Sequence, residues 1–293
     1  MKHLFHYCLI LLFSIIFLNS CNDDQIPEIK ETYVPDDNFE KKLIELGFDD
    51  ILDDYVLTKN IEDIDVMNLF GLGIKDLTGI EDFTSLSDLN CGGNLLTSLD
   101  VSNNQSLTKL RCDQNQLTNL DVSENTFLTE LWCDSNQLSS LEVGINTSLT
   151  WLYCKNNQLT SLDLSGSTSL DFLFCDNNQL TSLNVKLTSL DFIQCNNNQL
   201  TSLDISNQFN LQNLFCSNNK LTNLDVSNNK YLSNLLLSNN QLTNLDISFN
   251  TYLSEFNCTE NELTCVRVNQ IQLDNIPVGW NKDTDNSYSL DCN

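Results

Sequence analysis

Several residue types are scarce in this chain of 293 residues, and their scarcity excludes whole classes of function and structure. The two histidines, His3 and His6, lie in the first ten residues, so a chain without that segment has no histidine for acid–base catalysis or metal binding. Only 14 lysines and arginines oppose 40 aspartates and glutamates, and the net charge of -26 excludes attraction to nucleic-acid phosphates. The sequence contains no alanine and only 9 glycines, a composition that argues against long helices.

Residues 1–20 have the layout of a signal peptide. Lys2 precedes an apolar run, residues 9–18, that is too short to cross a bilayer. The sequence Leu-Asn-Ser-Cys that ends at Cys21 resembles a bacterial lipobox, which implies cleavage before Cys21 and acylation of that cysteine. Ordinary secretion with cleavage nearby is the alternative.

Residues 21–34 are polar and acidic without periodicity, and we interpret them as a tether between the lipid and the folded part. The acidic pair two residues after Cys21 is similar to signals that route some Gram-negative lipoproteins to the outer face. We therefore expect a protein of the bacterial cell surface, lipid-anchored in the outer membrane. A secreted or periplasmic protein is the alternative.

From Leu86 onward the chain repeats a unit of 21 residues, shortened once to 20. With Leu86 as position 1, the unit reads L-x-x-L-x-C-x-x-N-x-L-T-x-L-D-V-S-x-N-x-x. The deletion falls near residues 184–188, in the turn far from the expected strand. Nine units begin at Leu86, Leu107, Leu128, Leu149, Leu170, Leu190, Leu211, Leu232 and Leu253.

This pattern resembles the bacterial leucine-rich repeat family, and within it the internalin group with 21-residue, cysteine-bearing units. The resemblance implies a mainly β repeat solenoid, a right-handed coil with one short parallel strand per repeat and little helix beyond an N-terminal cap. The physical argument agrees, because one unit cannot bury its leucines alone and must stack on its neighbours. Internalins are adhesins, so the resemblance also implies a binding function.

The pattern predicts four regions after the tether. Residues 35–60 form an N-terminal cap, in which residues 35–46 predict a short amphipathic helix that ends at Gly47. Residues 61–85 are a divergent first repeat, residues 86–273 contain the nine repeats, and residues 274–293 form a C-terminal cap.

Position 9 is asparagine in every unit. A short amide there can turn inward and bond the backbone groups that the turn leaves unpaired, so we predict a structural ladder that passes from coil to coil. Its members are Asn94, Asn115, Asn136, Asn157, Asn178, Asn198, Asn219, Asn240 and Asn261.

The 12 cysteines divide among four roles. Cys8 leaves with the signal peptide and Cys21 would carry lipid. Cys265 and Cys292 lie on either side of the C-terminal segment, and we expect a disulfide that holds the cap in place. The rest occupy position 6, where one unit has Leu237 instead, so we predict buried, reduced thiols without zinc. They are Cys91, Cys112, Cys133, Cys154, Cys175, Cys195, Cys216 and Cys258.

Positions 3 and 5 of each unit are expected to face solvent on the concave side, and they vary from unit to unit. Seven aromatic residues gather there: Trp132, Trp151, Tyr153, Phe172, Phe174, Phe192 and Phe215. We name these seven the aromatic concave face, and Glu130, Asp171, Asp191 and Arg111 complete the candidate binding site. A solvent-facing apolar cluster of this size marks an interaction surface, although aromatic residues also simply suit strands.

Position 15 is mostly aspartate and position 17 mostly serine, a combination typical of turns whose side chains bond local backbone donors. A row of carboxylates could instead bind calcium, but we expect neither a metal nor a cofactor. Glycoside hydrolysis is disfavoured, because the sequence offers no singular carboxylate pair and no insertion that would form a cleft.

The sequence therefore predicts a monomeric, non-enzymatic binding protein whose partner is a protein of a host or neighbouring cell surface. A glycan is the alternative ligand, since aromatic platforms flanked by Asp and Asn also suit sugar stacking. Nucleic acid is excluded, and the membrane is contacted only through the N-terminal lipid. A purely structural coat protein would leave the aromatic concave face without a purpose.

Overall fold

The computed structural model describes residues 30–186 and 189–292. The chain divides into two compact units, residues 1–31 and 32–293, and almost all described residues belong to the second. The expected signal peptide, the lipidation site Cys21 and most of the tether lie outside the described residues. None of the helices in the described part has the length and apolar character that a membrane span requires.

A helix and a small sheet form the N-terminal region. Helix α2 (Asp37–Glu45) begins after Asp36, whose carboxylate accepts hydrogen bonds from the backbone N–H groups of Asn38 (2.9 Å) and Phe39 (3.2 Å). The ring of Phe39 is fully buried and packs on Phe83, with ring centroids 6.0 Å apart. The helix thus covers the apolar end of the repeat core. Beside it lie β1 (Glu31–Tyr33), β2 (Tyr55–Leu57) and the 3-10 turn η1 (Thr58–Asn60).

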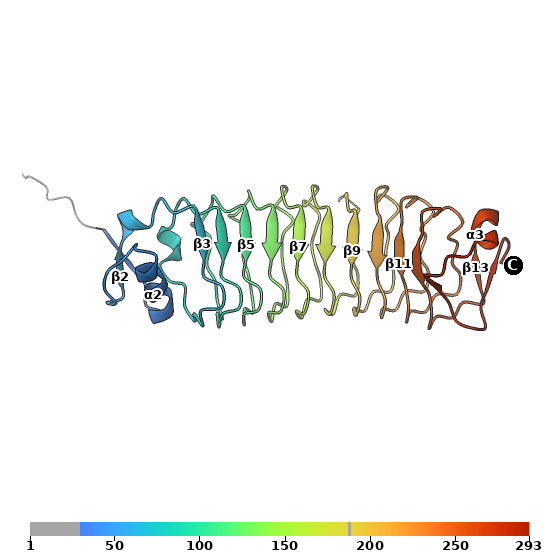
Figure 1. The fold of residues 1–293 in the computed structure, drawn as a ribbon, viewed down its shortest axis with the longest axis horizontal. Helices are drawn as coiled ribbons and strands as arrows, with labels where there is room; N and C mark the ends of the chain where they lie inside the picture. The colour runs from blue at the N-terminus through green and yellow to red at the C-terminus, as the bar shows by residue number, and fades with distance from the viewer. Residues whose placement is uncertain (1–29, 187–188, 293) are drawn as a thin grey trace, which may run out of the picture. The chain divides into compact units, whose positions relative to one another are not determined.

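One short strand per coil enters a parallel sheet of 11 strands, whose arrows lie side by side and point the same way in Figure 1. Sheet order follows chain order up to β12, and neighbouring strands are in register, with Leu131 opposite Leu152. The divergent unit, residues 61–85, supplies the first strand and the 3-10 turn η2 (Ile80–Asp82). The strands are β3 (Val66–Asn68), β4 (Asp88–Asn90), β5 (Lys109–Arg111), β6 (Glu130–Trp132), β7 (Trp151–Tyr153), β8 (Phe172–Phe174), β9 (Phe192–Gln194), β10 (Asn213–Phe215), β11 (Asn234–Leu236), β12 (Glu255–Asn257) and β14 (Trp280–Asn281).

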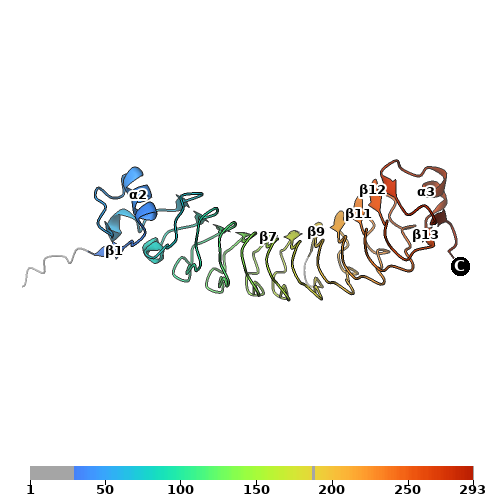
Figure 2. The same ribbon diagram turned by 90° about the horizontal axis from the view of Figure 1, so that it is seen from below.

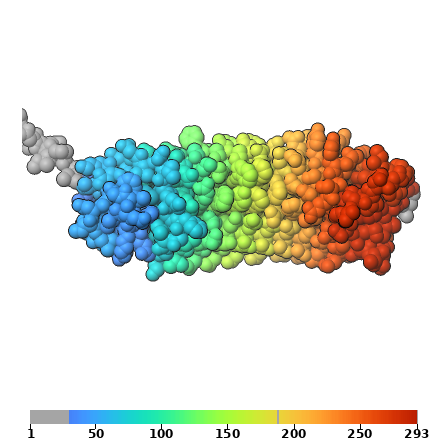
Figure 3. Space-filling model, viewed as in Figure 1, coloured from blue at the N-terminus to red at the C-terminus, as the bar shows by residue number. Residues whose placement is uncertain are grey.

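The core is one continuous column of side chains inside the coils. Leucines at positions 1, 4, 11 and 14 and the residue at position 6 are buried, as in the unit that contains Leu107, Leu110, Cys112, Leu117 and Leu120. Figure 2 shows the sheet of residues 32–293 on the inner side of a shallow arc, and Figure 3 shows successive coils packed without a break. Stacking therefore supplies the burial that a single coil cannot achieve.

The asparagines of position 9 bridge adjacent coils. The side-chain amide of Asn157 donates to the carbonyls of Cys133 (3.0 Å) and Cys154 (3.2 Å), and its oxygen accepts from the N–H of Leu138 (3.0 Å). The same set of bonds recurs along the array, as at Asn115. Each asparagine satisfies backbone groups that the turn buries, so the ladder expected from the sequence is present.

A second buried ladder occupies position 19 and has no counterpart among the predictions from the sequence. Asn125 donates to the carbonyls of Val101 (2.9 Å) and Asn104 (2.9 Å), and most coils repeat this arrangement. Unlike the position 9 amides, Asn125 has a buried side-chain oxygen without a partner among the described residues. The second ladder therefore secures the far turn with fewer bonds per side chain. Its members are Asn104, Asn125, Asn146, Ser167, Gln208, Asn229 and Asn250.

The C-terminal region continues the coil further than the repeat pattern indicates. Trp280 in β14 pairs with Phe256 in register, so residues 274–293 add a strand to the sheet as well as covering its end. Helix α3 (Gln270–Asp274) spans the expected boundary at residue 273, and Gln272 bonds the carbonyls of Ile247 and Asn250 as a last rung of the second ladder. Strands β13 (Cys265–Arg267) and β15 (Ser287–Ser289) form a separate two-stranded sheet.

The cysteines within the described residues fall into two chemical states. Cys265 and Cys292 form a disulfide with their Cα atoms 5.6 Å apart, the pairing expected from the sequence. All eight cysteines of position 6 are free and buried. Burial raises the pKa of the thiols of Cys91 and Cys258 to about 12, which keeps them protonated and unreactive near neutral pH. No group of three or more His, Cys, Asp or Glu within residues 30–186 and 189–292 is placed to hold a metal ion.

Candidate functional site

The aromatic concave face is formed by five successive strands, β6 to β10. In each of these strands the middle residue is buried and the two outer residues are half-buried. Side chains alternate along a strand, so positions 3 and 5 project from the sheet while position 4 enters the core. The structure therefore brings all seven aromatic residues onto one face.

The seven rings stack into one surface. Trp151 and Phe172 lie nearly parallel with centroids 3.8 Å apart, and Tyr153 and Phe174 do the same at 4.3 Å. Trp132 extends the second stack, with its centroid 4.5 Å from that of Tyr153. Parallel pairs at these distances gain stacking energy and cover one another, so the rings are less exposed than isolated strand residues would be.

Phe192 joins the two rows where one of them is interrupted. Position 5 of its own strand is Gln194, which offers no ring. The ring of Phe192 instead contacts Phe174 at 4.8 Å and meets Phe215 edge-on at 5.3 Å. The surface therefore stays continuous to strand β10, a link that two separate rows in the sequence do not reveal.

Charged residues close the N-terminal end of this face. Arg111 forms ion pairs with Asp88 (3.2 Å) and Glu130 (3.6 Å), and Glu130 also pairs with Lys109 at 2.7 Å. The guanidinium of Arg111 lies over the ring of Trp132, 5.4 Å from its centroid. Arg111 and Glu130 are thus held by other side chains, and they orient the edge of the aromatic surface.

A lysine outside the predicted set lies against the middle of the face. The ammonium of Lys155 is 5.2 Å from the ring centroid of Phe174 and 5.9 Å from that of Tyr153. Its backbone N–H donates to Asp134 Oδ1, and burial raises the pKa of Asp134 to about 6. Lys155 and Asp134 occupy position 7, one residue past the buried thiol, so the sequence places them at the border of the face and not among its strand positions 3 and 5.

Two acidic members of the predicted site lie outside the ring surface. Asp171 and Asp191 immediately precede strands β8 and β9, at position 2 of their units. Asp191 lines a separate depression with Tyr231 and Tyr252. Burial, with the negative charge of Asp171, raises the pKa of Asp191. The structure therefore divides the candidate residues between the aromatic concave face and an adjoining flank.

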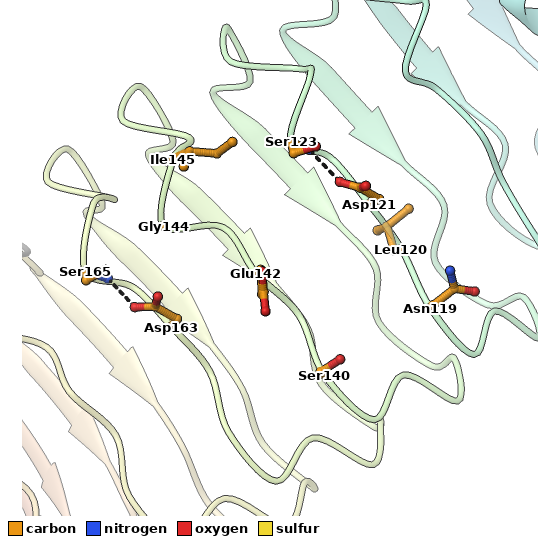
Figure 4. A pocket seen from close by; sticks show the side chains of 10 residues that line it. All are labelled: Asn119, Leu120, Asp121, Ser123, Ser140, Glu142, Gly144, Ile145, Asp163 and Ser165. Carbon is orange, nitrogen blue, oxygen red and sulfur yellow. Dashed lines mark hydrogen bonds between the residues drawn. The ribbon is translucent and has the colours of Figure 1, made fainter.

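The acidic row of position 15 lines a cavity of about 480 Å³ on the far turns, shown in Figure 4. There Asp121 accepts a hydrogen bond from the backbone N–H of Ser123 (2.9 Å), and Asp163 accepts one from Ser165 (2.9 Å). These bonds, with those from the serine hydroxyls, lower the pKa of both carboxyl groups. Position 15 thus supports the turn in the way expected for local Asp–Ser bonding.

Together, the parallel one-strand coils, the leucine column and the asparagine ladder define a leucine-rich repeat solenoid. Comparisons with protein-family models and with curated protein sequences find no match. Among solved structures, the functional domain of InlJ from Listeria monocytogenes, which includes a cysteine ladder, is similar with 32% identity and a TM-score of 0.77. The match covers 89% of this chain and 62% of that one. The chain is therefore an internalin-like leucine-rich repeat solenoid, as the sequence pattern predicts.

Two further structures share the fold. The internalin inlF of Listeria monocytogenes is 20% identical over 89% of this chain and 97% of its own, with a TM-score of 0.57. The leucine-rich repeat ectodomain of the Arabidopsis thaliana receptor kinase GASSHO1/SCHENGEN3 is 24% identical over 80% of this chain and 32% of its own, with a TM-score of 0.68. Both structures show that this chain shares the leucine-rich repeat fold.

Proposed function

We propose that this chain is a binding protein that recognises a protein partner through the aromatic concave face. The observation that carries the proposal is the continuous ring surface from Trp132 to Phe215, which stacks across five strands and does not belong to the leucine column. Aromatic side chains supply large contact areas at little entropic cost and dominate binding energy at protein interfaces.

The setting proposed from the sequence is a bacterial cell surface. Residues 1–20 would direct export, Cys21 would carry the lipid, and residues 21–34 would separate the repeat array from the outer membrane. The fold supports a binding role by analogy, because the receptor kinase ectodomain was solved in complex with CASPARIAN STRIP INTEGRITY FACTOR 2. Export without lipid remains the alternative for the anchor.

The proposal is tested with the double variant Trp132→Ala/Trp151→Ala. In a screen against host and neighbour-cell surface proteins, we expect the wild-type chain to capture a partner and the variant to lose at least about 30-fold in affinity, as for truncation of a hot spot. Phe249→Ala is the matched control, because this aromatic residue is 54% exposed but lies outside the ring surface. Unfolding midpoints of all three proteins establish that they are folded.

The outcomes separate the alternatives. Equal partner affinity of the wild type and the double variant contradicts the use of the aromatic concave face. A wild-type chain that binds a glycan instead, and loses it in the double variant, supports the glycan alternative for the same surface. Labelling with radioactive palmitate, with Cys21→Ser as control, tests the anchor separately.

A further inference from the structure

A second depression, of about 550 Å³, lies on the flank where the chain enters the strands. It spans four successive coils, a length of roughly 14 Å at the usual spacing of parallel strands. Its lining side chains come from the residues on either side of each unit's first leucine. They are Asp191, Asn210, Gln212, Tyr231, Ser233 and Tyr252.

Two exposed tyrosines form the apolar part of this depression. The residue before the first leucine is serine in five units, as at Ser148 and Ser169, but it is Tyr231 and Tyr252 here. Their rings are 56% and 65% exposed and pack on each other with centroids 6.1 Å apart. Neither ring enters the core, so tyrosine in place of serine adds exposed aromatic surface to the flank without adding to the core.

Three polar side chains of the depression, those of Asp191, Asn210 and Gln212, are available to a ligand. At the residue after the first leucine, other coils carry a hydroxyl that bonds the preceding coil, as Thr150 Oγ1 donates to the carbonyl of Thr129 at 2.9 Å. Asp191 and Gln212 replace this hydroxyl, and their side chains make no hydrogen bond within the described part of the chain. The side-chain amide of Asn210 is equally unengaged there. The row of hydroxyl bonds along the flank is thus missing at Asp191 and Gln212, and it resumes at Ser233, whose hydroxyl donates to the carbonyl of Gln212 at 3.1 Å.

The chemistry of the lining selects the ligand. Two amides donate and accept hydrogen bonds, one carboxylate accepts them, and two tyrosine rings offer faces for C–H groups. No lysine or arginine lines the depression, and Asp191 with its neighbour Asp171 disfavours anions. A neutral polyhydroxylated molecule satisfies all of these groups, and the volume lies in the range of small-molecule sites.

We propose that this flank depression is a binding site for a short neutral oligosaccharide, which stacks on Tyr231 and Tyr252 and bonds Asp191, Asn210 and Gln212. The site differs from the aromatic concave face in residues and in ligand class. It would let one chain hold a surface glycan and a protein partner at the same time.

The experiment uses the folded chain and an array of neutral oligosaccharides built from glucose, galactose, mannose and N-acetylglucosamine. We expect at least one to bind, and calorimetry to show that Tyr231→Ala/Tyr252→Ala weakens binding about tenfold or more through lost stacking. Phe127→Ala is the matched control, because Phe127 also precedes a first leucine and is 64% exposed, but it does not line the depression. Gln212→Thr restores the residue type of other coils and should weaken binding without lowering the unfolding midpoint.

Several results would contradict the proposed saccharide site. The proposal is wrong if no neutral oligosaccharide binds, if only charged glycans bind, or if the double tyrosine variant binds as the wild type does. Trp132→Ala/Trp151→Ala should leave saccharide binding intact. If it alone abolishes that binding, the sugar lies on the aromatic concave face and the flank site is refuted, while loss of protein binding in the same variant is a separate readout.

Discussion

Carboxyl groups at the strand side of the coil and at the far turn experience different surroundings, although the same repeat supplies both. Asp134 follows strand β6 and Asp176 follows strand β8, and burial raises the pKa of each. At the far turn, hydrogen bonds from Ser123 and Ser165 lower the pKa of Asp121 and Asp163.

This difference shows that the far turn and the strand side of one coil have different roles. At the far turn each aspartate bonds its own backbone, so the turn is complete and its charge faces water. At the strand side, Lys155 lies over the ring of Phe174, and Asp134 accepts a hydrogen bond from the backbone N–H of Lys155 in the next coil. The carboxylates of the far turn thus stabilise the turn itself. The rings on the strand side lie outside the leucine core, so they can contact a partner.

The largest expected effect compares the two asparagine ladders. Asn157→Ala removes three donated bonds and one accepted bond, and the backbone groups left buried should cost about 4 kcal/mol of unfolding free energy. Asn146→Ala removes two donated bonds and also an oxygen that has no partner among the described residues, so it should cost about 2 kcal/mol. Urea unfolding measures both values. Equal losses would show that the oxygen of Asn146 is satisfied in solution, and the proposed asymmetry of the ladders would then be wrong.

The second prediction uses pH. The folded-state pKa of Asp134, about 6, is above its ordinary value, so its ionised form opposes folding at high pH and this penalty fades as the pH falls through 6. Asp134→Asn should therefore stabilise the chain at pH 8 and have a smaller effect at pH 5. The difference between variant and wild type, from urea unfolding at the two pH values, isolates this group.

Asp121→Asn is the matched control at the far turn. The pKa of Asp121 is lowered, so its contribution is present above the unfolded value and is lost only in more acidic solution. Its substitution should destabilise slightly and equally at pH 8 and pH 5. A pH-independent effect of Asp134→Asn would remove the contrast between the two sides.

The smallest expected effect concerns one hydroxyl. Ser123→Ala keeps the backbone N–H that bonds Asp121 but removes the hydroxyl, so the pKa of Asp121 should rise towards its ordinary value. The change in unfolding free energy should stay within about 0.5 kcal/mol, as for other exposed sites. NMR titration of the Asp121 carboxyl reports the shift, and an unchanged pKa would assign the effect to the backbone bond alone.

Much of the fold can be predicted because each feature depends on its own unit. Every coil repeats the leucine spacing and the inward asparagine of position 9. Every coil also needs an apolar side chain at position 6, which is leucine at Leu237 and cysteine in the other units. The recurrence of asparagine at position 19, as at Asn125 and Asn146, is visible in the sequence. Whether these side chains point into the coil depends on how the far turn closes, which the sequence does not show. The added strand around Trp280 has no repeat signature, because it meets the sheet through contacts rather than through sequence period.

The site shows the same division. Alternation along a strand places Trp151 and Phe172 on one face, and the sequence suffices for that statement. Which rings touch, whether Phe192 bridges two rows, and that Asp191 belongs with Tyr231 and Tyr252 depend on side-chain packing between coils.

By itself, then, the sequence determined the solenoid, its register and the identity of the residues that face outward, because a 21-residue repeat, shortened only once, assigns every position the same backbone environment. Only the tertiary structure decided which outward residues act together and which carboxyl groups are buried. These properties arise between coils, from distances and water exclusion that no single unit contains.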